Sequence, residues 1–483
     1  MARRRRRPNP AIRAREALGE AISGLIAHPI QTALLSLASV LLLYFIATQS
    51  LPFAIAARNP DLAIFLNAQH PAGLMAKAQQ LRQRLLELTV LSDGPSEEAA
   101  QRPATGNSLE ALPVTGLSPE QKAQVDAERK ELREQIRELA IRAIASDPLN
   151  ARAFTLLAEV SEGREVTKAF AEAAVRRSRR ETSSLFWLLN DSVYDKNYAK
   201  VVEQGDILLR TSPQLAPYVV GYLGAVADDA EARPLLVAKL KETPAPKWRE
   251  RFFTLLPGKT ESPETPLALM LELKEAEEPL TNDEMKPYLA WLVREGLAEY
   301  AYNAWLRLLP EAELASVGSL YNASFDNEPA GHPFDWQLAR GINATAELVP
   351  DQTVPTLRVL HLAFADGRVR FPTVAQVVVL APGRYRVEGK LRGTIRARRG
   401  LKWQLRCLYG ERALAGETEM LMGQSDRWRL FSFEATIPDG DECRGQALRL
   451  IHDARMASEE FLAGEVWFDD MKITRLQDEP KAP

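Results

Sequence analysis

The feature that most constrains this chain is a long stretch without charged side chains near its beginning. No Asp, Glu, Lys or Arg occurs in residues 21–57, and the centre of that stretch reads IQTALLSLASVLLLYFIATQSL. The hydrocarbon core of a bilayer requires about 20 apolar helical residues. A helix on the surface of a globular core would instead show a polar stripe. The stretch therefore predicts a transmembrane helix over residues 29–52.

A cluster of basic residues precedes this stretch, and it consists of Arg3, Arg4, Arg5, Arg6 and Arg7. A nucleic-acid-binding arm would normally lead into a basic domain. Here the formal net charge of the chain is -3, which leaves an acidic excess after the cluster. Clustered arginines beside a first apolar segment hold that end in the cytoplasm. We therefore expect a cytoplasmic basic head over residues 1–28, a single membrane anchor, a bulk outside the cytoplasm and no nucleic-acid partner.

A cleaved signal peptide is the main alternative to a permanent anchor. Ala54, Ile55 and Ala56 supply a small-x-small sequence of the kind that precedes a cleavage site. The apolar region, however, is longer than the usual length of about 7 to 15 residues. We favour an uncleaved single-pass anchor and leave cleavage open as the alternative.

The next part of the chain is predicted to be helical. Helix-forming residues at helical spacing extend over residues 59–310, and a polar stretch rich in Pro, Gly and Ser interrupts them at residues 92–117. After the interruption, Ser118, Pro119 and Gln121 predict an N-cap, a first-turn proline and a capping box. We therefore expect a helical region with one flexible insertion.

Part of the helical region resembles tetratricopeptide repeats, a family of helix-turn-helix units of about 34 residues. In SDPLNARAFTLLAEV, the residues Phe154, Leu157 and Ala158 stand at positions that match a repeat, and Trp187 and Tyr194 do so in FWLLNDSVYDKNYAKVVEQGDILLRTSP. The second unit departs from the family where Asn and Asp replace its Leu-Gly pair. The resemblance implies a helical solenoid that engages envelope proteins.

After the helical region the hydrophobic period changes to two. In GRYRVEGKLRGTIRARRG, the residues Tyr385, Val387, Leu391 and Ile395 alternate with polar residues. Similar runs follow at short spacing, which predicts an antiparallel β-sandwich over residues 319–477. The expected fold class is multidomain α + β, with a transmembrane helix, a TPR-like α-helical solenoid and a C-terminal jelly roll.

This sandwich resembles the galactose-binding-like jelly rolls of carbohydrate-binding modules. The resemblance rests on an entry strand, LYNASFDNEPAGHPFDWQL, and a closing strand, GEVWFDDMKITRL. It implies that exposed aromatic side chains stack on sugar rings, and in the family a structural calcium can lie near the closing strand. The available aromatic residues are Trp336, Trp403, Trp428 and Trp467.

For two of these tryptophans, the neighbouring residues indicate where the side chain lies. Trp403 shares its strand parity with Leu405 and Cys407, so we expect it in the core. Trp336 follows Asp335 beside a loop that contains Pro and Gly. Because loops carry binding residues more often than strands do, Asp335 and Trp336 are the predicted ligand-binding residues, while a core position for Trp336 stays open as the alternative.

The chain has only two cysteines, Cys407 and Cys443. An oxidising compartment would allow them to pair, so we expect one disulfide within the sandwich, with Cys443 at the start of a strand CRGQALRLI. Without a CxxC motif or a histidine cluster these cysteines make a poor metal site. The sequence therefore predicts neither a metal site nor a cofactor.

No arrangement of residues in the sequence predicts a reaction. His332 is expected in a loop, where it lacks the spacing to a serine or a carboxylate that would suggest a triad. Asp469 and Asp470 are adjacent on a predicted strand, so their side chains should point to opposite faces, which is unsuitable for paired acid–base work. We therefore expect that the protein is not an enzyme.

The two resemblances imply a non-catalytic periplasmic scaffold, anchored in a bacterial inner membrane, in the production or export of cell-envelope polysaccharide or exopolysaccharide. The repeats would bind envelope proteins and the sandwich would bind glycan. The alternative is an enzyme that modifies envelope glycans. An exposed aromatic side chain together with two carboxylates on one face of the sandwich would favour the enzyme, whereas an apolar patch of protein size would favour the scaffold.

The predicted topology can be tested with a reporter fused after Val90. An alkaline phosphatase fusion should be active and a cytoplasm-dependent reporter at the same position inactive, because the arginine cluster holds the preceding end inside. Replacing Arg3 to Arg7 by glutamine should weaken this orientation. Activity of the cytoplasm-dependent reporter in the unaltered chain would overturn the topology.

Overall fold

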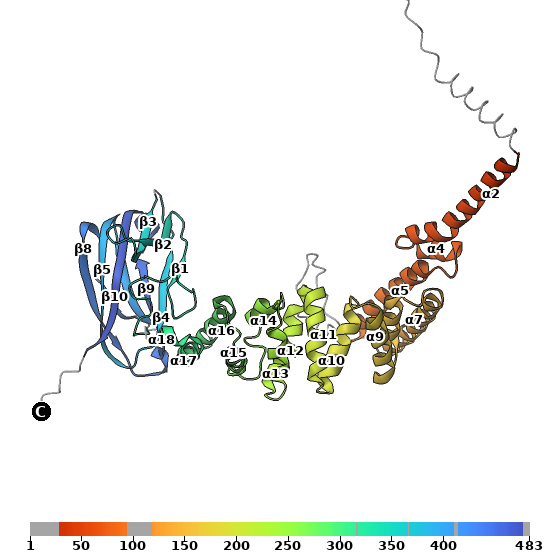
Figure 1. Cartoon of the computed structure of the whole chain (residues 1–483), viewed down its shortest axis with the longest axis horizontal. Helices are drawn as coiled ribbons and strands as arrows, with labels where there is room; N and C mark the ends of the chain where they lie inside the picture. The colour runs from red at the N-terminus through yellow and green to blue at the C-terminus, as the bar shows by residue number, and fades with distance from the viewer. Residues whose placement is uncertain (1–28, 94–117, 315–316, 366, 410–413, 477–483) are drawn as a thin grey trace, which may run out of the picture. The chain divides into compact units, whose positions relative to one another are not determined.

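The structure is a computed structural model, and it describes residues 29–93, 118–314, 317–365, 367–409 and 414–476 (Figure 1). The arginine cluster and most of the predicted insertion lie outside the described residues. The chain divides into two compact units, Met1–Asp191 and Ser192–Pro483. The boundary falls inside a helix, and the later helices belong to the same unit as the strands.

The described part of the first unit is entirely helical or connecting structure. Its helices are α2 (Pro29–Phe45), the π-helical turn η1 (Ile46–Ser50), α3 (Leu51–Ile55), α4 (Pro60–Leu66), α5 (Pro71–Asp93), α7 (Pro119–Ser146), α8 (Ala151–Val160), α9 (Arg164–Arg177) and most of α10 (Thr182–Tyr194).

The first helices form the apolar span that the sequence predicted. The helical stretch Ala33–Ile55 is 23 residues long, and its apolar window is 0% buried. Leu41 and Phe45 are 58% and 59% exposed to solvent. The span is therefore long and apolar enough to cross a membrane. A signal sequence near an N-terminus has the same properties, so the permanent anchor stays a prediction.

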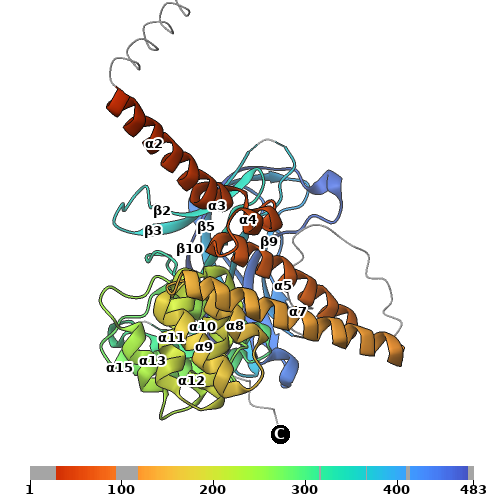
Figure 2. The same ribbon diagram turned by 90° about the vertical axis from the view of Figure 1, so that its right-hand side faces the viewer.

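The predicted start of α7 is confirmed in detail. The Ser118 hydroxyl accepts a hydrogen bond from the Gln121 backbone N–H, and the Gln121 side chain accepts one from the Ser118 backbone N–H. Both bonds satisfy donors that a helix start leaves unpaired. α5 and α7 run side by side (Figure 2). They share with α8 a core that contains Leu74, Met75, Ala78, Ile136, Ala140, Ala143, Ala153, Leu156, Leu157 and Val160.

The second unit begins with further helices. They are α11 (Tyr198–Thr211), the 3-10 turn η2 (Pro213–Leu215), α12 (Ala216–Asp228), α13 (Arg233–Leu240), α14 (Arg249–Leu255), α15 (Thr265–Glu275), α16 (Asn282–Arg294), α17 (Ala298–Leu308) and α18 (Glu311–Leu314). The helical prediction for this region is confirmed, whereas membership of the tetratricopeptide family stays a prediction. Of the residues that carry the resemblance, Leu157 is buried and Tyr194 is 78% exposed.

The strands form two antiparallel five-stranded sheets. They are β1 (Gln337–Ala339), β2 (Ala344–Pro350), β3 (Arg358–Phe364), β4 (Thr373–Val378), β5 (Gly383–Ala397), β6 (Leu401–Cys407), β7 (Leu414–Glu417), β8 (Gly423–Ile437), β9 (Gln446–His452) and β10 (Leu462–Arg475), with 3-10 turns η3 (Asp441–Cys443) and η4 (Ala457–Glu459). One sheet has the order β1-β4-β9-β6-β7 and the other β2-β3-β10-β5-β8. The predicted sandwich is confirmed.

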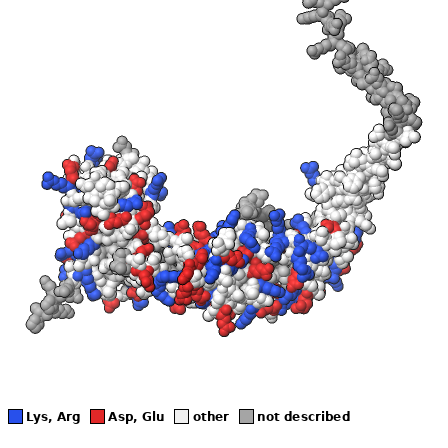
Figure 3. Space-filling view, in the orientation of Figure 1, with Lys and Arg blue, Asp and Glu red and all other residues white. Residues whose placement is uncertain are grey.

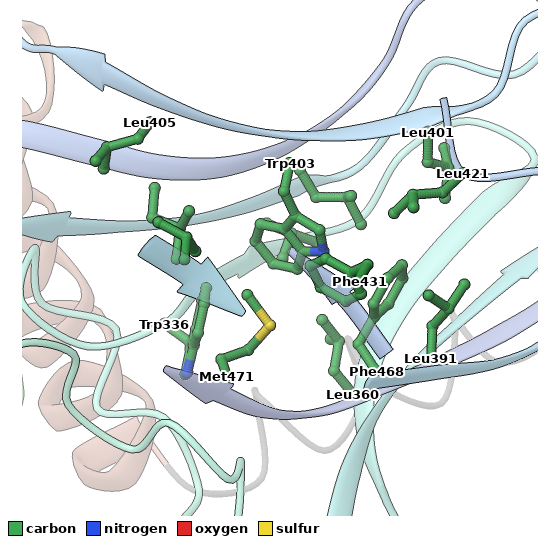
Figure 4. Packing of buried hydrophobic residues seen from close by; sticks show 14 of the residues in the cluster. Trp336, Leu360, Leu391, Leu401, Trp403, Leu405, Leu421, Phe431, Phe468 and Met471 are labelled. Carbon is green, nitrogen blue, oxygen red and sulfur yellow. The ribbon is translucent and has the colours of Figure 1, made fainter. Parts of the chain in front are cut away.

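A single hydrophobic core lies between the two sheets. Trp403 is completely buried, as its strand parity predicted, and its ring meets those of Trp336 and Phe468 edge to face at 5.8 and 5.6 Å (Figure 4). The indole N–H of Trp403 has no hydrogen-bond acceptor among the residues that the structure describes. Trp403 therefore contributes through packing alone.

Two local predictions about the sandwich were wrong. The expected entry strand forms only over β1. Before it, Asn322 and Phe325 adopt positive φ angles of 47° and 58°, and the Asn322 side chain hydrogen-bonds the backbone N–H and carbonyl of Asn327. A left-handed backbone of this kind belongs to turns rather than strands. Cys443 ends η3 instead of starting a strand, and β9 begins at Gln446.

The predicted disulfide between Cys407 and Cys443 is present, with a Cα–Cα distance of 4.7 Å and a sequence separation of 36 residues. It ties the end of β6 to the turn that leads into β9. These two strands are hydrogen-bonded neighbours, with Cys407 opposite Gln446. The disulfide therefore joins two segments that the pairing of β6 with β9 already holds close to each other.

Replacing Trp403 by alanine should destabilise the sandwich by about 3 to 5 kcal/mol, because the change leaves a large cavity in the core. Trp403→Phe should cost less, since the indole N–H that it removes has no acceptor. Chemical denaturation of the two variants followed by tryptophan fluorescence would measure the difference. Equal stability of Trp403→Ala and the unaltered protein would contradict the packing role.

Candidate functional site

The two predicted ligand-binding residues lie inside the protein. Trp336 is 0% exposed, its ring packs on Phe325 and its indole N–H donates a 2.8 Å hydrogen bond to the Asn322 carbonyl. Asp335 is 2% exposed, and its carboxylate accepts backbone N–H groups of Ala330 and Trp336, both at 2.7 Å. Burial raises the pKa of Asp335.

The prediction that Trp336 stacks on a sugar is therefore wrong in this structure, because stacking requires an exposed ring face. The loop that carries Asp335 and Trp336 packs over the core instead of projecting into solvent. Substitution of Trp336 should consequently act through stability, as for Trp403.

The other two tryptophans of the sandwich lie on the outer face of the β2-β3-β10-β5-β8 sheet. Trp467 stands on β10 between the buried residues Val466 and Phe468, so its side chain points away from the core. Its direct neighbours across the strands are His361 on β3 and Arg392 on β5. Trp428 lies on the edge strand β8. We call His361, Trp467, Arg392 and Trp428 the aromatic row.

The members of the aromatic row contact one another directly. The rings of His361 and Trp467 stack with centroids 4.9 Å apart and planes 19° apart. The Arg392 guanidinium lies 5.6 Å from the Trp467 ring centroid and 4.7 Å from that of Trp428. Lys390 adds its ammonium group 4.9 Å from the Trp428 ring. These cation–π contacts join the side chains of four adjacent strands into one surface.

Arg392 is held in place by a carboxylate from the turn after β2. Asp351 accepts a 3.1 Å hydrogen bond from Arg392, and the same carboxylate accepts bonds from the hydroxyl and backbone N–H of Thr353 and the N–H of Val354. The Thr353 hydroxyl, followed by these backbone donors and Arg392, lowers the pKa of Asp351 below its usual value of 3.8. Asp351 is therefore ionised at neutral pH and orients the guanidinium between the two tryptophans.

Asp469 and Asp470 lie on the same outer face, so the prediction that they point to opposite faces was wrong. Their carboxylates are 3.1 and 2.7 Å from the Lys390 ammonium. The cause is a β-bulge in β10 between Asp469 and Lys472, where Asp470 has a φ of 49°. An extra residue in a strand reverses the alternation of side chains beyond it.

The environment of this cluster changes the pKa of two of its members. Burial raises the pKa of Asp469, although the neighbouring N–H of Asp470 and the Lys390 ammonium oppose the change. Burial by itself would lower the pKa of Lys390, but hydrogen bonds to Asp470 and Asp469 outweigh it and the net change is upward. Lys390 is therefore charged at neutral pH and its ammonium is shared between two carboxylates.

The face combines flat rings with hydrogen-bonding groups of both signs. Glu347 and Glu465 flank the His361 ring, with carboxylate oxygens 4.0 and 3.5 Å from its nitrogens. Acidic and basic side chains are also intermixed on the side of the sandwich that Figure 3 presents. A surface of this kind can hold the C–H face of a sugar ring against the indoles and bond the ring's hydroxyls at its edges.

Sequence reasoning named Trp428 and Trp467 but did not select them. The parity of Trp467 between Val466 and Phe468 was a usable indication that it points outward. The pairing of Trp467 with Arg392 and His361 was not visible, because it depends on strand order and register. Within the described residues, no group of three or more His, Cys, Asp or Glu side chains is placed to hold a metal ion.

Comparisons with solved structures found similar folds that cover about one third of the chain. A Bacteroides thetaiotaomicron protein described as sugar-binding covers 33% of this chain and 100% of its own, at 9% identity and a TM-score of 0.26. A family 4 carbohydrate-binding module has the same coverages at 19% identity and a TM-score of 0.25. A family 61 module in complex with β-1,4-galactotriose also has these coverages, at 16% identity and a TM-score of 0.23.

These structural neighbours are carbohydrate-binding-module-like sandwiches. With TM-scores this low, they carry no argument about the ligand of this chain, which rests on the residues of the aromatic row. No protein-family model matches the chain, and the search of curated proteins found no match.

The role of Asp351 can be tested by the pH dependence of stability. Because folding lowers its pKa, Asp351 stabilises the protein above the unfolded-state pKa of about 3.9, and this contribution is lost as the pH falls through the folded-state value. Asp351→Asn should therefore melt below the unaltered protein at pH 7, and the difference should shrink below about pH 4. Thermal melts followed by near-ultraviolet circular dichroism would measure it, and a difference that grows on acidification would contradict the assignment.

Proposed function

We propose that the sandwich binds an uncharged glycan chain across the aromatic row. The observation that carries this proposal is that Trp467 and Trp428 both contact the Arg392 guanidinium on one face of the sheet. Polar side chains surround the two rings. The row extends over three strand spacings of about 4.8 Å each, or about 14 Å, which suits several sugar units better than one. The two cations of this face, Lys390 and Arg392, are each paired with carboxylates, so neither offers an unpaired positive charge to an acidic polymer.

The setting that we propose is a periplasmic scaffold attached to the inner membrane. The apolar helical span Ala33–Ile55 supports an anchor. The disulfide between Cys407 and Cys443 supports an oxidising compartment. The helices between the anchor and the sandwich would bind envelope proteins, as the resemblance to tetratricopeptide repeats implies. In this role the protein would hold an envelope polysaccharide or exopolysaccharide near the machinery that makes or exports it.

One observation favours the alternative of a glycan-modifying enzyme. Asp469 and Asp470 stand on the same face as the two outer tryptophans, and two carboxylates near an aromatic platform are the residues that glycoside hydrolysis uses. Both carboxylates, however, contact Lys390, and a general acid or nucleophile would have to leave that ion pair. We therefore propose binding without turnover as the principal function.

Glycan binding can be tested with the full-length protein in detergent, by affinity electrophoresis through gels that contain galactan, xylan or β-1,3-glucan. Trp467→Ala and Trp428→Ala should each weaken binding about tenfold, equivalent to ~1.4 kcal/mol, because each removes a stacking surface. The melting temperature should change little, since both rings lie outside the core.

Phe461→Ala is the matched control, because Phe461 is an aromatic residue of the sandwich that is 51% exposed but lies outside the row. It should leave retardation unchanged. Equal weakening by all three variants, or no retardation by any polysaccharide, would overturn the proposed site. Release of reducing ends by the unaltered protein, lost in Asp469→Asn, would instead support the enzyme.

A further inference from the structure

The end of the apolar span is built into the folded part of the first unit. After Ser50 the chain continues as α3, turns, and returns as α4, which packs against both α3 and α5 (Figure 2). Ala56 and Ala63 are buried, and a Cβ added to Gly73 of α5 would lie 3.2 Å from the Ala63 Cβ. Small residues of this kind let helices approach closely. We call residues 51–66 the α3–α4 hairpin.

A hydrogen bond joins the end of the hairpin to the span. Pro52 has no backbone N–H, so the Thr48 carbonyl lacks the donor that an α-helix would supply four residues later. The side-chain amide of Asn67, which directly follows α4, donates to this carbonyl at 2.9 Å. Backbone groups at membrane depth have to be satisfied within the protein. Asn67 thereby holds the end of α4 at the level of Thr48.

The length of the span indicates where a bilayer would end. From Pro29 to Thr48 the helix rises about 30 Å, which is the thickness of the hydrocarbon core. Thr48, Gln49 and Ser50 are three consecutive polar residues, so the boundary of the hydrocarbon would fall at them. The α3–α4 hairpin begins directly after this boundary. It would therefore lie in the headgroup layer, which is about 5 to 8 Å thick on each side.

The hairpin exposes apolar side chains at this level. Phe53, Leu62 and Phe65 are 71%, 44% and 84% exposed. Leu62 and Phe65 are three residues apart on α4, so they share one side of it. Asp61 is the only carboxylate of the hairpin, and Lys77 of α5 pairs with it at 3.0 Å. On the side that Figure 3 presents, the surface of α2 to α4 is almost free of charged side chains.

We propose that the α3–α4 hairpin lies in the interfacial layer of the membrane, with Phe53, Leu62 and Phe65 at the boundary between headgroups and acyl chains. Apolar helical faces bind lipid surfaces in this way. Arg58 is exposed in the turn between the two helices, where its long side chain reaches lipid phosphates. The occupant of this apolar face is therefore the lipid itself, because the face is continuous with the membrane span.

The consequence concerns the helices that follow. Since α4 packs on α5, a hairpin held in the interface fixes the direction in which α5 leaves the membrane. The first unit would then be attached rigidly and not by a free tether. This inference rests on the proposed membrane anchor and is independent of glycan binding at the aromatic row.

The test uses full-length protein in phosphatidylcholine vesicles, with bimane attached to one introduced cysteine. The two native cysteines are joined to each other, so the introduced thiol is the one that reacts. Phe65→Cys reports on the hairpin, and Leu41→Cys, which is 58% exposed, reports on the span. Val166→Cys is the matched control, because Val166 is a 48% exposed apolar residue of α9, which packs on α8. All three changes replace exposed side chains, so folding should be retained.

The vesicles contain lipids with a doxyl quencher, either near the carbonyl end or near the methyl end of the acyl chain. The shallow quencher should reduce emission of the Phe65→Cys label about twofold and exceed the deep one, as expected for an interfacial position. The Leu41→Cys label should respond more to the deep quencher, and the Val166→Cys label to neither.

A Phe65→Cys label that neither lipid quencher affects, beside a quenched Leu41→Cys label, would overturn the proposal and indicate that a protein covers this face. Equal quenching of the Phe65→Cys and Val166→Cys labels would also overturn it, because it would show general adsorption to lipid. An unquenched Leu41→Cys label would instead remove the membrane anchor, and this inference with it. The failure of the hairpin proposal and the failure of the anchor are therefore distinguishable.

Discussion

The alternation of side chains along β10 is the constraint on which the candidate glycan-binding face depends. β10 pairs with β3 on one side and β5 on the other, so it is the central strand of its sheet. Its side chains alternate between the core and the outer face. Val466 and Phe468 point inward and anchor the strand, and this leaves Trp467 no direction except outward. The burial of its neighbours thereby places the half-buried tryptophan on the outer face.

The bulge in β10 changes what the same face can do. Without it, Asp470 would point toward the core, where an unpaired carboxylate is costly. With it, Met471 and Ile473 take the inward positions, and both Asp469 and Asp470 reach Lys390. The extra residue thus keeps the core apolar and gathers charge beside the tryptophans. It also places two carboxylates on one face, which is the arrangement that a glycan-hydrolysing enzyme would use.

The central cation of the outer face has its partners within the protein. On the outer face, Arg392 already has the Asp351 carboxylate and two rings as partners, so its geometry is set before any ligand arrives. A preformed face favours stacking of a flat ligand.

The sequence by itself determined the apolar span, the α7 capping box, the helical and strand regions, the burial of Trp403 and the disulfide. Each of these depends on short-range spacing or on composition: 3.6-residue and two-residue periods, a cap three residues from its partner, or the presence of only two cysteines. The tertiary structure alone decided the candidate sites. It buried Trp336 because the loop around Asn322 folds over the core, it turned Asp470 outward through a bulge, and it aligned His361, Trp467, Arg392 and Trp428 through strand order. These residues are far apart along the chain, and only the pairing of strands brings them together.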